Sequence, residues 1–402
     1  MTGEPKNDKL FNPAYILLII VVASISFSFN VVASTITSYA TSVGLALSAA
    51  GVMAGIFSFA ALFGRPLSGV CSDRFSKKRV AAIAAVVMAL SVFGYGIMPS
   101  PAMLFAFRFL HGFAFAFCTT SEFAMAPFCI PKNKIGSGMG YLGMGQVLAG
   151  AVGPLISISL VDTIGYRAVY TADSIFLLAI ASLILFLPDD KALSAADPDR
   201  PGNVPRAKRD THTFLNTLWA KECTGICIFA GLLSVTAGIT TSYIKSLGEA
   251  RGIAGVGAFF TMQSIFILIV RPFAGWLTDK KGAVFVYLPA FAFSTLAMVL
   301  LGGAYSLPMV LIAAPFMALG NGCGQPALQA ESVRRVNQAR TGVAIATYCL
   351  GTDIGQGIGP MIGGVISERA GYGVMFASAA ALQLAALIIG LLMIRPLKKS
   401  GK

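Results

Sequence analysis

Charged side chains are scarce in this 402-residue sequence. Only 12% of the residues are Asp, Glu, Lys or Arg, whereas 56% are hydrophobic, and soluble globular domains carry about 25% charged residues. No charged residue occurs between Leu10 and Gly64, a stretch long enough for two helices of about 20 residues that each cross the hydrocarbon core. A porin-type barrel would show short alternating segments instead. The sequence therefore predicts a helical protein that crosses the membrane several times.

Residues that form metal, redox and nucleotide sites are also few. The only histidines are His111 and His212, and none of the seven cysteines form a CxxC pair, so neither a zinc site nor a disulfide framework is expected. The pattern GxxxxGK[ST] does not occur, which argues against transport driven by ATP hydrolysis. We expect no cofactor, no bound metal and no enzymatic activity.

Apolar runs separated by turn residues or charges predict twelve spans. They lie at 14–38, 48–71, 79–98, 102–124, 136–160 and 166–187, and then at 222–244, 253–277, 283–304, 307–330, 341–366 and 371–394. The segment between the two sets contains four prolines and many charges of both signs, which is typical of a solvated linker. We therefore predict an N-terminal six-helix bundle at 1–187, a cytoplasmic linker at 188–218 and a C-terminal six-helix bundle at 219–402.

The basic residues predict the orientation of the chain. A net charge of +13 can indicate nucleic acid binding, but here the charges form short clusters between apolar runs. With the N-terminus inside, 23 of the 30 Lys and Arg fall in inner segments and four in outer loops. This excess predicts a multi-pass protein of the cytoplasmic membrane with both termini and the linker in the cytoplasm, and no nucleic acid partner.

One pattern occurs twice. The stretches FGRPLSGVCSDRFSKKRV, from Phe63, and IVRPFAGWLTDKKGAVFV, from Ile269, share Arg-Pro, a Gly, an Asp and a basic residue at the same spacing. The same offset of 206 residues relates Gly153-Pro154 to Gly359-Pro360 and Gly165-Tyr166 to Gly371-Tyr372. The chain is therefore interpreted as two copies of one six-span plan, and parallel repeats around a midplane cavity are a transporter architecture.

These motifs resemble the major facilitator superfamily. GVCSDRFSKKR resembles the loop between helices 2 and 3 of its transporters, and FRFLHGFAF, at 107–115, resembles the helix-4 pattern of an Arg followed four residues later by a Gly. GQVLAGAVGPLIS, at 145–157, resembles the helix-5 motif of the twelve-span drug/proton antiporters, and GQGIGPMIGG, at 355–364, is its counterpart in helix 11. Ser76 and Ser157 stand where the family usually has glycine. The resemblance implies alternating access, a small-molecule substrate and protons as the coupling ion.

The doubled motif predicts a latch at the cytoplasmic rim. Asp73 can accept hydrogen bonds from a helix N-terminus, Arg74 can pair with Glu122, and Glu331 can pair with Lys280 or Arg335. The alternative is that the basic residues only set the orientation. The predicted latch comprises Gly69, Asp73, Arg74, Glu122, Gly275, Asp279, Lys280 and Glu331.

Polar residues inside the spans predict a path for substrate and protons. Arg108 and His111 share one face of helix 4, and ionisable residues within a membrane are functional by default. Asp353 lies near the middle of its span, where a carboxylate costs less when it is protonated. The predicted path comprises Asn30, Arg108, His111, Gln263, Asn321, Gln325, Asp353 and Gln356. The alternative is that these side chains only satisfy backbone groups or hold helices together.

Small residues predict close packing between the halves, at Gly150, Gly153, Pro154, Gly355, Gly359 and Pro360. Our first interpretation is a monomeric, proton-coupled exporter of a small amphipathic molecule, embedded in the lipid bilayer. The second is uptake or exchange of an organic anion, whose carboxylate Arg108 can bind. The third is a non-transporting membrane sensor, which the short termini are expected to disfavour.

The orientation can be tested by cysteine accessibility. In a cysteine-free variant, single cysteines replacing Ala195 and Gly401 should be protected from an impermeant thiol reagent in intact cells, whereas those replacing Gly44 and Gly248 should react. Labelling of position 195 in intact cells would show that the orientation is wrong.

Overall fold

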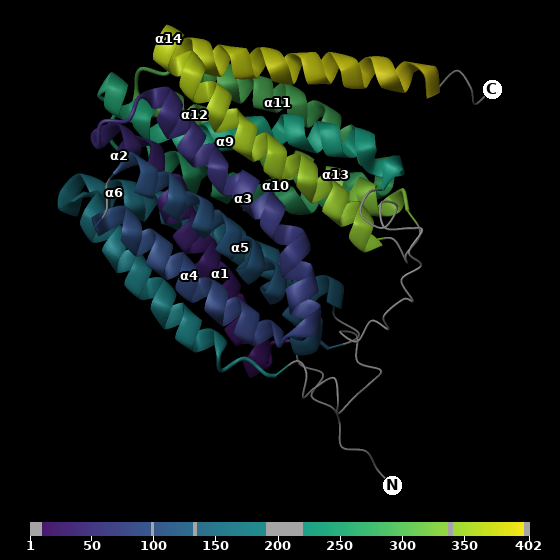
Figure 1. Ribbon diagram of the computed structural model, residues 1–402. Helices are drawn as coiled ribbons and strands as arrows, with labels where there is room; N and C mark the ends of the chain where they lie inside the picture. The colour runs from purple at the N-terminus through teal and green to yellow at the C-terminus, as the bar shows by residue number, and fades with distance from the viewer. Residues whose placement is uncertain (1–9, 98–99, 132–134, 190–219, 337–340, 398–402) are drawn as a thin grey trace. The chain divides into compact units, whose positions relative to one another are not determined.

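The computed structural model describes residues 10–97, 100–131, 135–189, 220–336 and 341–397, and within these ranges it contains helices and no strand (Figure 1). Ten helical stretches in this part of the chain are long and apolar enough to cross a membrane, as the composition predicts. The elements are α1 (Pro13–Ala33), α2 (Ile36–Ser42), α3 (Leu47–Arg74), α4 (Lys77–Ile97), α5 (Pro101–Cys129), α6 (Ile135–Ile184), η3 (Lys221–Cys223), α9 (Thr224–Arg251), α10 (Ala258–Lys281), α11 (Val284–Gly302), α12 (Leu307–Met317), η4 (Ala318–Gly322), α13 (Cys323–Arg334) and α14 (Thr341–Leu397).

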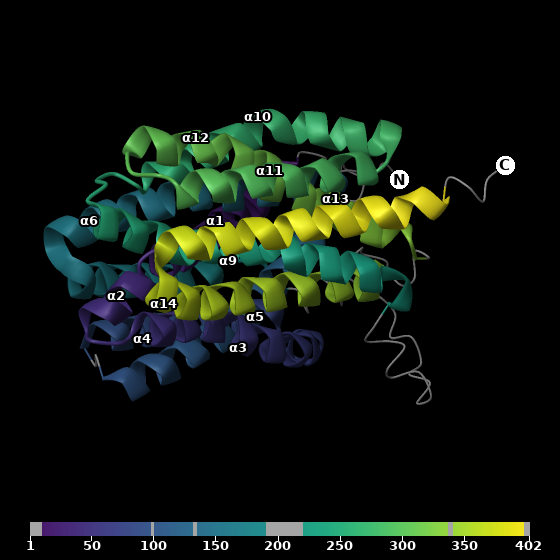
Figure 2. The same cartoon turned by 90° about the horizontal axis from the view of Figure 1, so that it is seen from above.

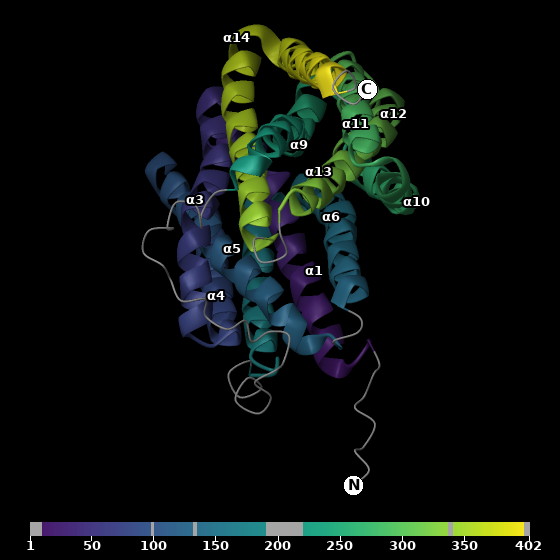
Figure 3. The ribbon, with the colours of Figure 1, turned by 90° about the vertical axis from the view of Figure 1, so that its right-hand side faces the viewer.

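Two helices are long enough for two spans each, and both break at a glycine. α6 has 50 residues and α14 has 57. Gly165 in α6 has φ 81° and ψ 163°, and Gly371 in α14 has φ 82° and ψ 168°, a conformation that is essentially restricted to glycine. Figure 3 shows the two arms of α14 on either side of its break. The offset of 206 residues therefore relates two equal backbone conformations, and the twelve-span count stays a prediction.

The helices differ in detail from two predicted spans. The first span, 14–38, contains a turn, because α1 ends at Ala33 and α2 begins at Ile36. The seventh was expected to end at residue 244, but α9 continues to Arg251 and ends at Gly252, whose φ of 65° is the left-handed conformation of a glycine helix cap. Lys245, assigned to an outer loop from the sequence, is consequently a helical residue and only 2% exposed.

The chain divides into two compact units. Unit 1 comprises Met1–Val32, Ala60–Gly153 and Leu160–Lys208, and unit 2 comprises Ala33–Phe59, Pro154–Ser159 and Arg209–Lys402. Unit 2 therefore includes two stretches from the first half of the sequence. The predicted linker lies almost wholly outside the described residues, so the division into two six-helix bundles stays a prediction.

Small residues let the helices of unit 1 approach one another. α4 and α5 pack side by side (Figure 1). A Cβ atom at Gly64 of α3 would lie 3.1 Å from the carbonyl oxygen of Phe113 in α5. Further along the same two helices, the hydroxyl groups of Ser72 and Ser121 are 2.7 Å apart. The α3 and α5 backbones are therefore in close contact near the doubled motif.

The arms of α14 have different neighbours in unit 2. The first arm packs against α9, and the second packs against α11, beside which it lies in Figure 2. Apolar side chains of α9, α10, α11, α12 and α14 form the larger core of the unit. This packing holds the polar residues described below in fixed positions.

The glycine at the break in α6 can be tested by substitution. Gly165→Ala should lower stability by about 1–3 kcal/mol, because alanine is strained at this φ and ψ. Gly150→Ala is the control, since both positions have space for a Cβ but Gly150 is helical, where alanine is favoured by roughly 0.5–1 kcal/mol. Thermal unfolding of the purified variants measures both. Equal stability of the two would contradict the assigned conformation.

Candidate functional site

A polar cluster lies in unit 2 where α9, α13 and the first arm of α14 meet. The side-chain amide of Gln325 donates from Nε2 to Ser234 Oγ at 2.7 Å and to the carbonyl oxygen of Ala230 at 3.2 Å. Tyr348 donates from its hydroxyl to Gln325 Oε1 at 2.7 Å. Gln325 thus joins three helices, and both ends of its amide are satisfied.

Asn321 extends this cluster along α9. It lies in η4, a π-helical turn, and such turns are frequent at functional sites. The turn ends at Gly322. Pro326, four residues later, has no N–H group, so it cannot donate a hydrogen bond to the Gly322 carbonyl oxygen. Asn321 Nδ2 donates to Thr236 Oγ1 at 2.9 Å. Its Oδ1 is buried and accepts no hydrogen bond within the described part of the chain, so it can accept one from a bound molecule.

The other predicted path residues of unit 2 lie on α14 and α10. Asp353 is 9% exposed and lies on the same arm of α14 as Tyr348. Gln356, on that arm, and Gln263, on α10, are half-buried. The structure therefore brings Asn321 and Gln325 together through α9, and it places a buried carboxylate on the helix that supplies Tyr348.

Arg108, His111 and Tyr95 form a separate polar group in unit 1. Arg108 is 2% exposed and His111 is fully buried, both on α5. The hydroxyl of Tyr95 lies 3.2 Å from His111 Nδ1, which places α4 next to this face of α5. Asn30, on α1, donates to the carbonyl oxygen of Ser26 in its own helix at 2.7 Å.

A buried carboxylate in unit 1 was left out of the predicted path. Asp173 is 5% exposed and accepts a hydrogen bond from Ser28 Oγ at 2.7 Å. Its partner Ser28 was not among the predicted path residues either. The signal that could have found the pair is the general rarity of carboxylates inside spans.

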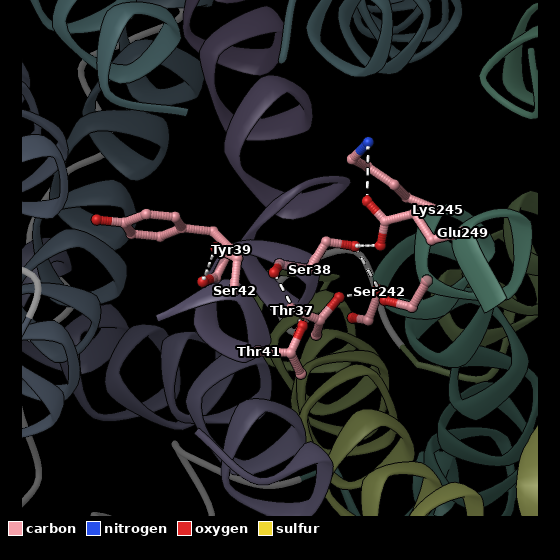
Figure 4. A network of polar contacts seen from close by, with 9 residues as sticks. Thr37, Ser38, Tyr39, Thr41, Ser42, Ser242, Lys245 and Glu249 are labelled. Carbon is pink, nitrogen blue, oxygen red and sulfur yellow. Dashed lines mark hydrogen bonds and ion pairs between the residues drawn. The ribbon is translucent and has the colours of Figure 1, made fainter. Parts of the chain in front are cut away.

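A second polar network, which sequence analysis missed, joins α2 to the C-terminal part of α9 (Figure 4). Ser38 donates to Glu249 Oε2 at 2.9 Å, and its hydroxyl lies 3.0 Å from that of Ser246. Lys245 Nζ is 3.1 Å from Glu249 Oε1. Thr37 also donates to the carbonyl oxygen of Ser242. The available signal was the i,i+4 spacing of Lys245 and Glu249, which supports a helix rather than a loop.

The predicted latch is described only in part. The structure does not describe the side chains of Asp73, Arg74 and Asp279 or the surroundings of Gly69. Glu122 is 1% exposed and accepts a weak hydrogen bond from Cys118 Sγ at 3.4 Å. Of the two partners expected for Glu331, the structure shows Arg335, with Nε 2.9 Å from Glu331 Oε1. Lys280 instead lies over the ring of Trp276, and Gly275, on the same helix, is exposed.

The predicted packing glycines of α14 face α9. A Cβ atom at Gly359 would lie 2.6 Å from the carbonyl oxygen of Val235, and one at Gly355 would overlap the backbone of Gly231. The carbonyl of Pro360 accepts a hydrogen bond from the hydroxyl of Tyr243 at 2.8 Å. Small residues at such positions let helix backbones approach in membranes.

Their counterparts on α6 differ. A Cβ at Gly153 would meet Asn30 of α1 at 3.0 Å, whereas Gly150 has nothing within 4 Å. Pro154 lies inside α6, and the carbonyl oxygen of Pro154 would be 3.3 Å from a Cβ at Gly257. Sequence analysis missed Gly51 and Gly55 of α3, which meet Pro360 and Gly357 of α14.

Known proteins that resemble this chain in sequence are membrane transporters of one family. The model described as Major Facilitator Superfamily matches residues 16–257 and 223–402. The multi-drug resistance efflux pump PmrA of Streptococcus pneumoniae is 25% identical over 360 residues, covering 89% of this chain and 87% of the pump. The multidrug resistance protein MdtG of Enterobacter lignolyticus is 25% identical over 370 residues, covering 87% and 84%.

Solved structures share the fold. The nucleoside transporter NupG has a TM-score of 0.77 at 14% identity, covering 95% of this chain and 99% of that one. A POT family transporter in complex with 5-aminolevulinic acid has a TM-score of 0.78 at 14% identity, covering 98% of each. The all-α transporter fold expected from the sequence is therefore confirmed.

The network between α2 and α9 predicts an asymmetry between two charge substitutions. Glu249→Gln should lower stability by about 1–3 kcal/mol, because the buried Lys245 ammonium loses this carboxylate. Lys245→Met should cost less than about 1 kcal/mol, since it keeps the apolar stem, and Glu249 is 47% exposed and can be hydrated. Thermal unfolding of the purified variants gives the order. The reverse order would contradict the assigned pair.

Proposed function

This chain belongs to the major facilitator superfamily, and we propose that it is a secondary active transporter that exports a small amphipathic molecule in exchange for protons. The observation that carries the proposal is the polar cluster of Gln325, Tyr348 and Asn321, of which Tyr348 and Asn321 are buried and Gln325 is half-buried. Efflux is favoured because PmrA and MdtG are described as multidrug resistance proteins.

The cluster suits a substrate that is mostly apolar with few polar groups. Asn321 Oδ1 offers a hydrogen-bond acceptor without a partner among the described residues, and other side chains of α9 and α12, such as Ile239 and Met317, are apolar and belong to the core of the unit. Binding sites for small molecules are generally of this kind, with a few polar groups that fix the orientation of the ligand. A donor on the substrate would satisfy Asn321, so the cluster favours molecules with an amine or hydroxyl group.

We assign the coupling proton to Asp353. It is a buried carboxylate on α14, and a carboxylate can take up and release a proton. Access from one side of the membrane would load the proton, and access from the other side would release it.

The network of Ser38, Ser246 and Glu249 is proposed to act as a gate. In the orientation that the basic residues predict, the C-terminal part of α9 faces the outside. Alternating access requires contacts at this level to form in one state and break in the other. Hydroxyl and partly hydrated charged groups suit this role, because water can replace each partner when the contact opens.

A specific observation favours a second candidate function. Arg108 is 2% exposed next to His111 in unit 1, and a buried guanidinium binds a carboxylate strongly through paired hydrogen bonds. This arrangement would suit uptake or exchange of an organic anion. Under that function Arg108→Gln would abolish binding of the anion, whereas efflux of an uncharged or cationic compound would persist.

Transport by the purified protein tests the proposal. In proteoliposomes, an imposed proton gradient should drive accumulation of one or more compounds from a panel of amphipathic dyes. Asp353→Asn should lose this accumulation and keep substrate binding and counterflow, because the amide cannot carry the proton. Asp162→Asn, at an exposed position on α6, is the control and should retain coupling. Full gradient-driven accumulation by folded Asp353→Asn protein would exclude this role.

The latch at the doubled motif predicts a different defect. Asp73→Asn should slow turnover severalfold with little change in substrate affinity, because the predicted latch shares no residue with the polar cluster. Flux measured over a range of substrate concentrations separates the two effects. A variant with normal flux, or with reduced affinity alone, would show that Asp73 does not act as a latch.

A further inference from the structure

A groove of about 790 Å³ lies in unit 1 between α4 and α5. Its walls are apolar side chains, namely Ile83, Val87, Leu110, Phe113 and Phe117. The buried residues Ala84 and Ala114 also line it, and their small side chains leave the space between the helices open. Ile83 is 66% exposed and Leu110 is 40% exposed, so the groove opens to the surroundings of the protein.

One end of the groove is charged. Arg79, in the first turn of α4, lines it and is exposed. None of the hydrogen bonds or ion pairs described for the structured part of the chain involves Arg79. Asp189 lines the same end, but Lys78 Nζ lies 3.9 Å from its Oδ2 and offsets its charge. Lys77, one residue earlier, lies over the ring of Phe128. The local charge is therefore positive, and the Arg79 guanidinium is available to a ligand.

We propose that this groove binds an anionic phospholipid. The phosphate of the headgroup would pair with Arg79, which presents several N–H donors in a planar array that matches phosphate oxygens. An acyl chain would lie along the apolar walls. Arg79 and Val87 are eight residues apart on one helix, which corresponds to about 12 Å, so the charge and the apolar walls have the arrangement of a lipid headgroup and the upper part of its tail.

Charge selects this lipid over other occupants. Basic pockets between membrane helices commonly bind anionic headgroups. A zwitterionic lipid would bring a positive group toward Arg79, and a cationic transported compound would be repelled by it. The site is distinct from the polar cluster of unit 2, so it does not depend on the substrate of the transporter.

Lipid-dependent thermal unfolding of the purified full chain in detergent tests the proposal. Palmitoyl-oleoyl phosphatidylglycerol should raise the melting temperature, whereas the matching phosphatidylcholine should act severalfold more weakly and inorganic phosphate should have no effect. Arg79→Gln should weaken the apparent affinity for phosphatidylglycerol about fivefold, the equivalent of about 1 kcal/mol per basic residue near an anionic lipid. Arg79→Lys should retain most of the effect.

Arg167→Gln is the matched control, since it removes one exposed arginine from α6 of the same unit and lies outside the groove. It should bind phosphatidylglycerol like the unmodified protein. Equal stabilisation by both lipids, or equal losses in Arg79→Gln and Arg167→Gln, would overturn the proposal.

A second readout does not depend on stability. Cys71 lines the groove and is half-buried, so in a variant that keeps only this cysteine an apolar maleimide should react several times more slowly when phosphatidylglycerol is present. Phosphatidylcholine should protect Cys71 less. Equal reaction rates with either lipid would contradict the assignment. Displacement of phosphatidylglycerol by a transported dye would instead place the groove on the substrate path and would also overturn it.

Discussion

A polar group inside a hydrocarbon layer must find its hydrogen-bond partner within the protein, because no water is available there. The contacts of unit 2 follow from this requirement. Gln325 is satisfied by Ser234, by a backbone carbonyl of α9 and by Tyr348. A group that is only partly satisfied, such as Asn321 with its buried Oδ1, is then the natural place for a substrate to bind. Polar residues in this chain therefore mark both what holds the helices together and where a ligand can enter.

The glycines of α14 bring helix backbones close together, so that polar groups on neighbouring helices can reach one another. Gly355 and Gly359 bring α14 against the backbone of α9, and the same helix α9 carries Ser234, which bonds to Gln325 of α13. Tyr243, on another part of α9, donates to the carbonyl oxygen of Pro360 of α14 at 2.8 Å. Close packing and polar satisfaction are thus one feature of the α9–α14 contact. If this contact moves, the polar cluster must change with it.

Much of the fold could be predicted from the sequence, because hydropathy and helix breakers act locally. The breaks at Gly165 and Gly371 appear in the sequence as a repeated Gly-Tyr pair, and the structure gives both the same backbone conformation. Asn321 and Gln325, which were expected on the path, both bond to residues of α9. Partners could not be predicted, since they depend on which helix faces which.

Two buried charged residues could not be placed from the local sequence. Lys245 was assigned to water because an isolated lysine usually ends a span, but its partner Glu249 lies on the next turn and the helix continues. Asp173 was left out of the predicted path, and its partner, Ser28, is 145 residues away in the sequence. In both cases the missing information was a contact between side chains, and composition does not contain it.

Alternating access requires the contact of α2 with α9 to open and close during transport, and a reversible cross-link tests whether it does. In a cysteine-free variant, Ser38→Cys with Ser246→Cys places two thiols where the hydroxyls are 3.0 Å apart. We predict that the oxidised protein loses gradient-driven transport in proteoliposomes and regains it on reduction. Ser38→Cys alone, which cannot form a disulfide within the chain, is the control and should transport in both redox states. Undiminished transport by the fully cross-linked Ser38→Cys, Ser246→Cys protein would contradict the account.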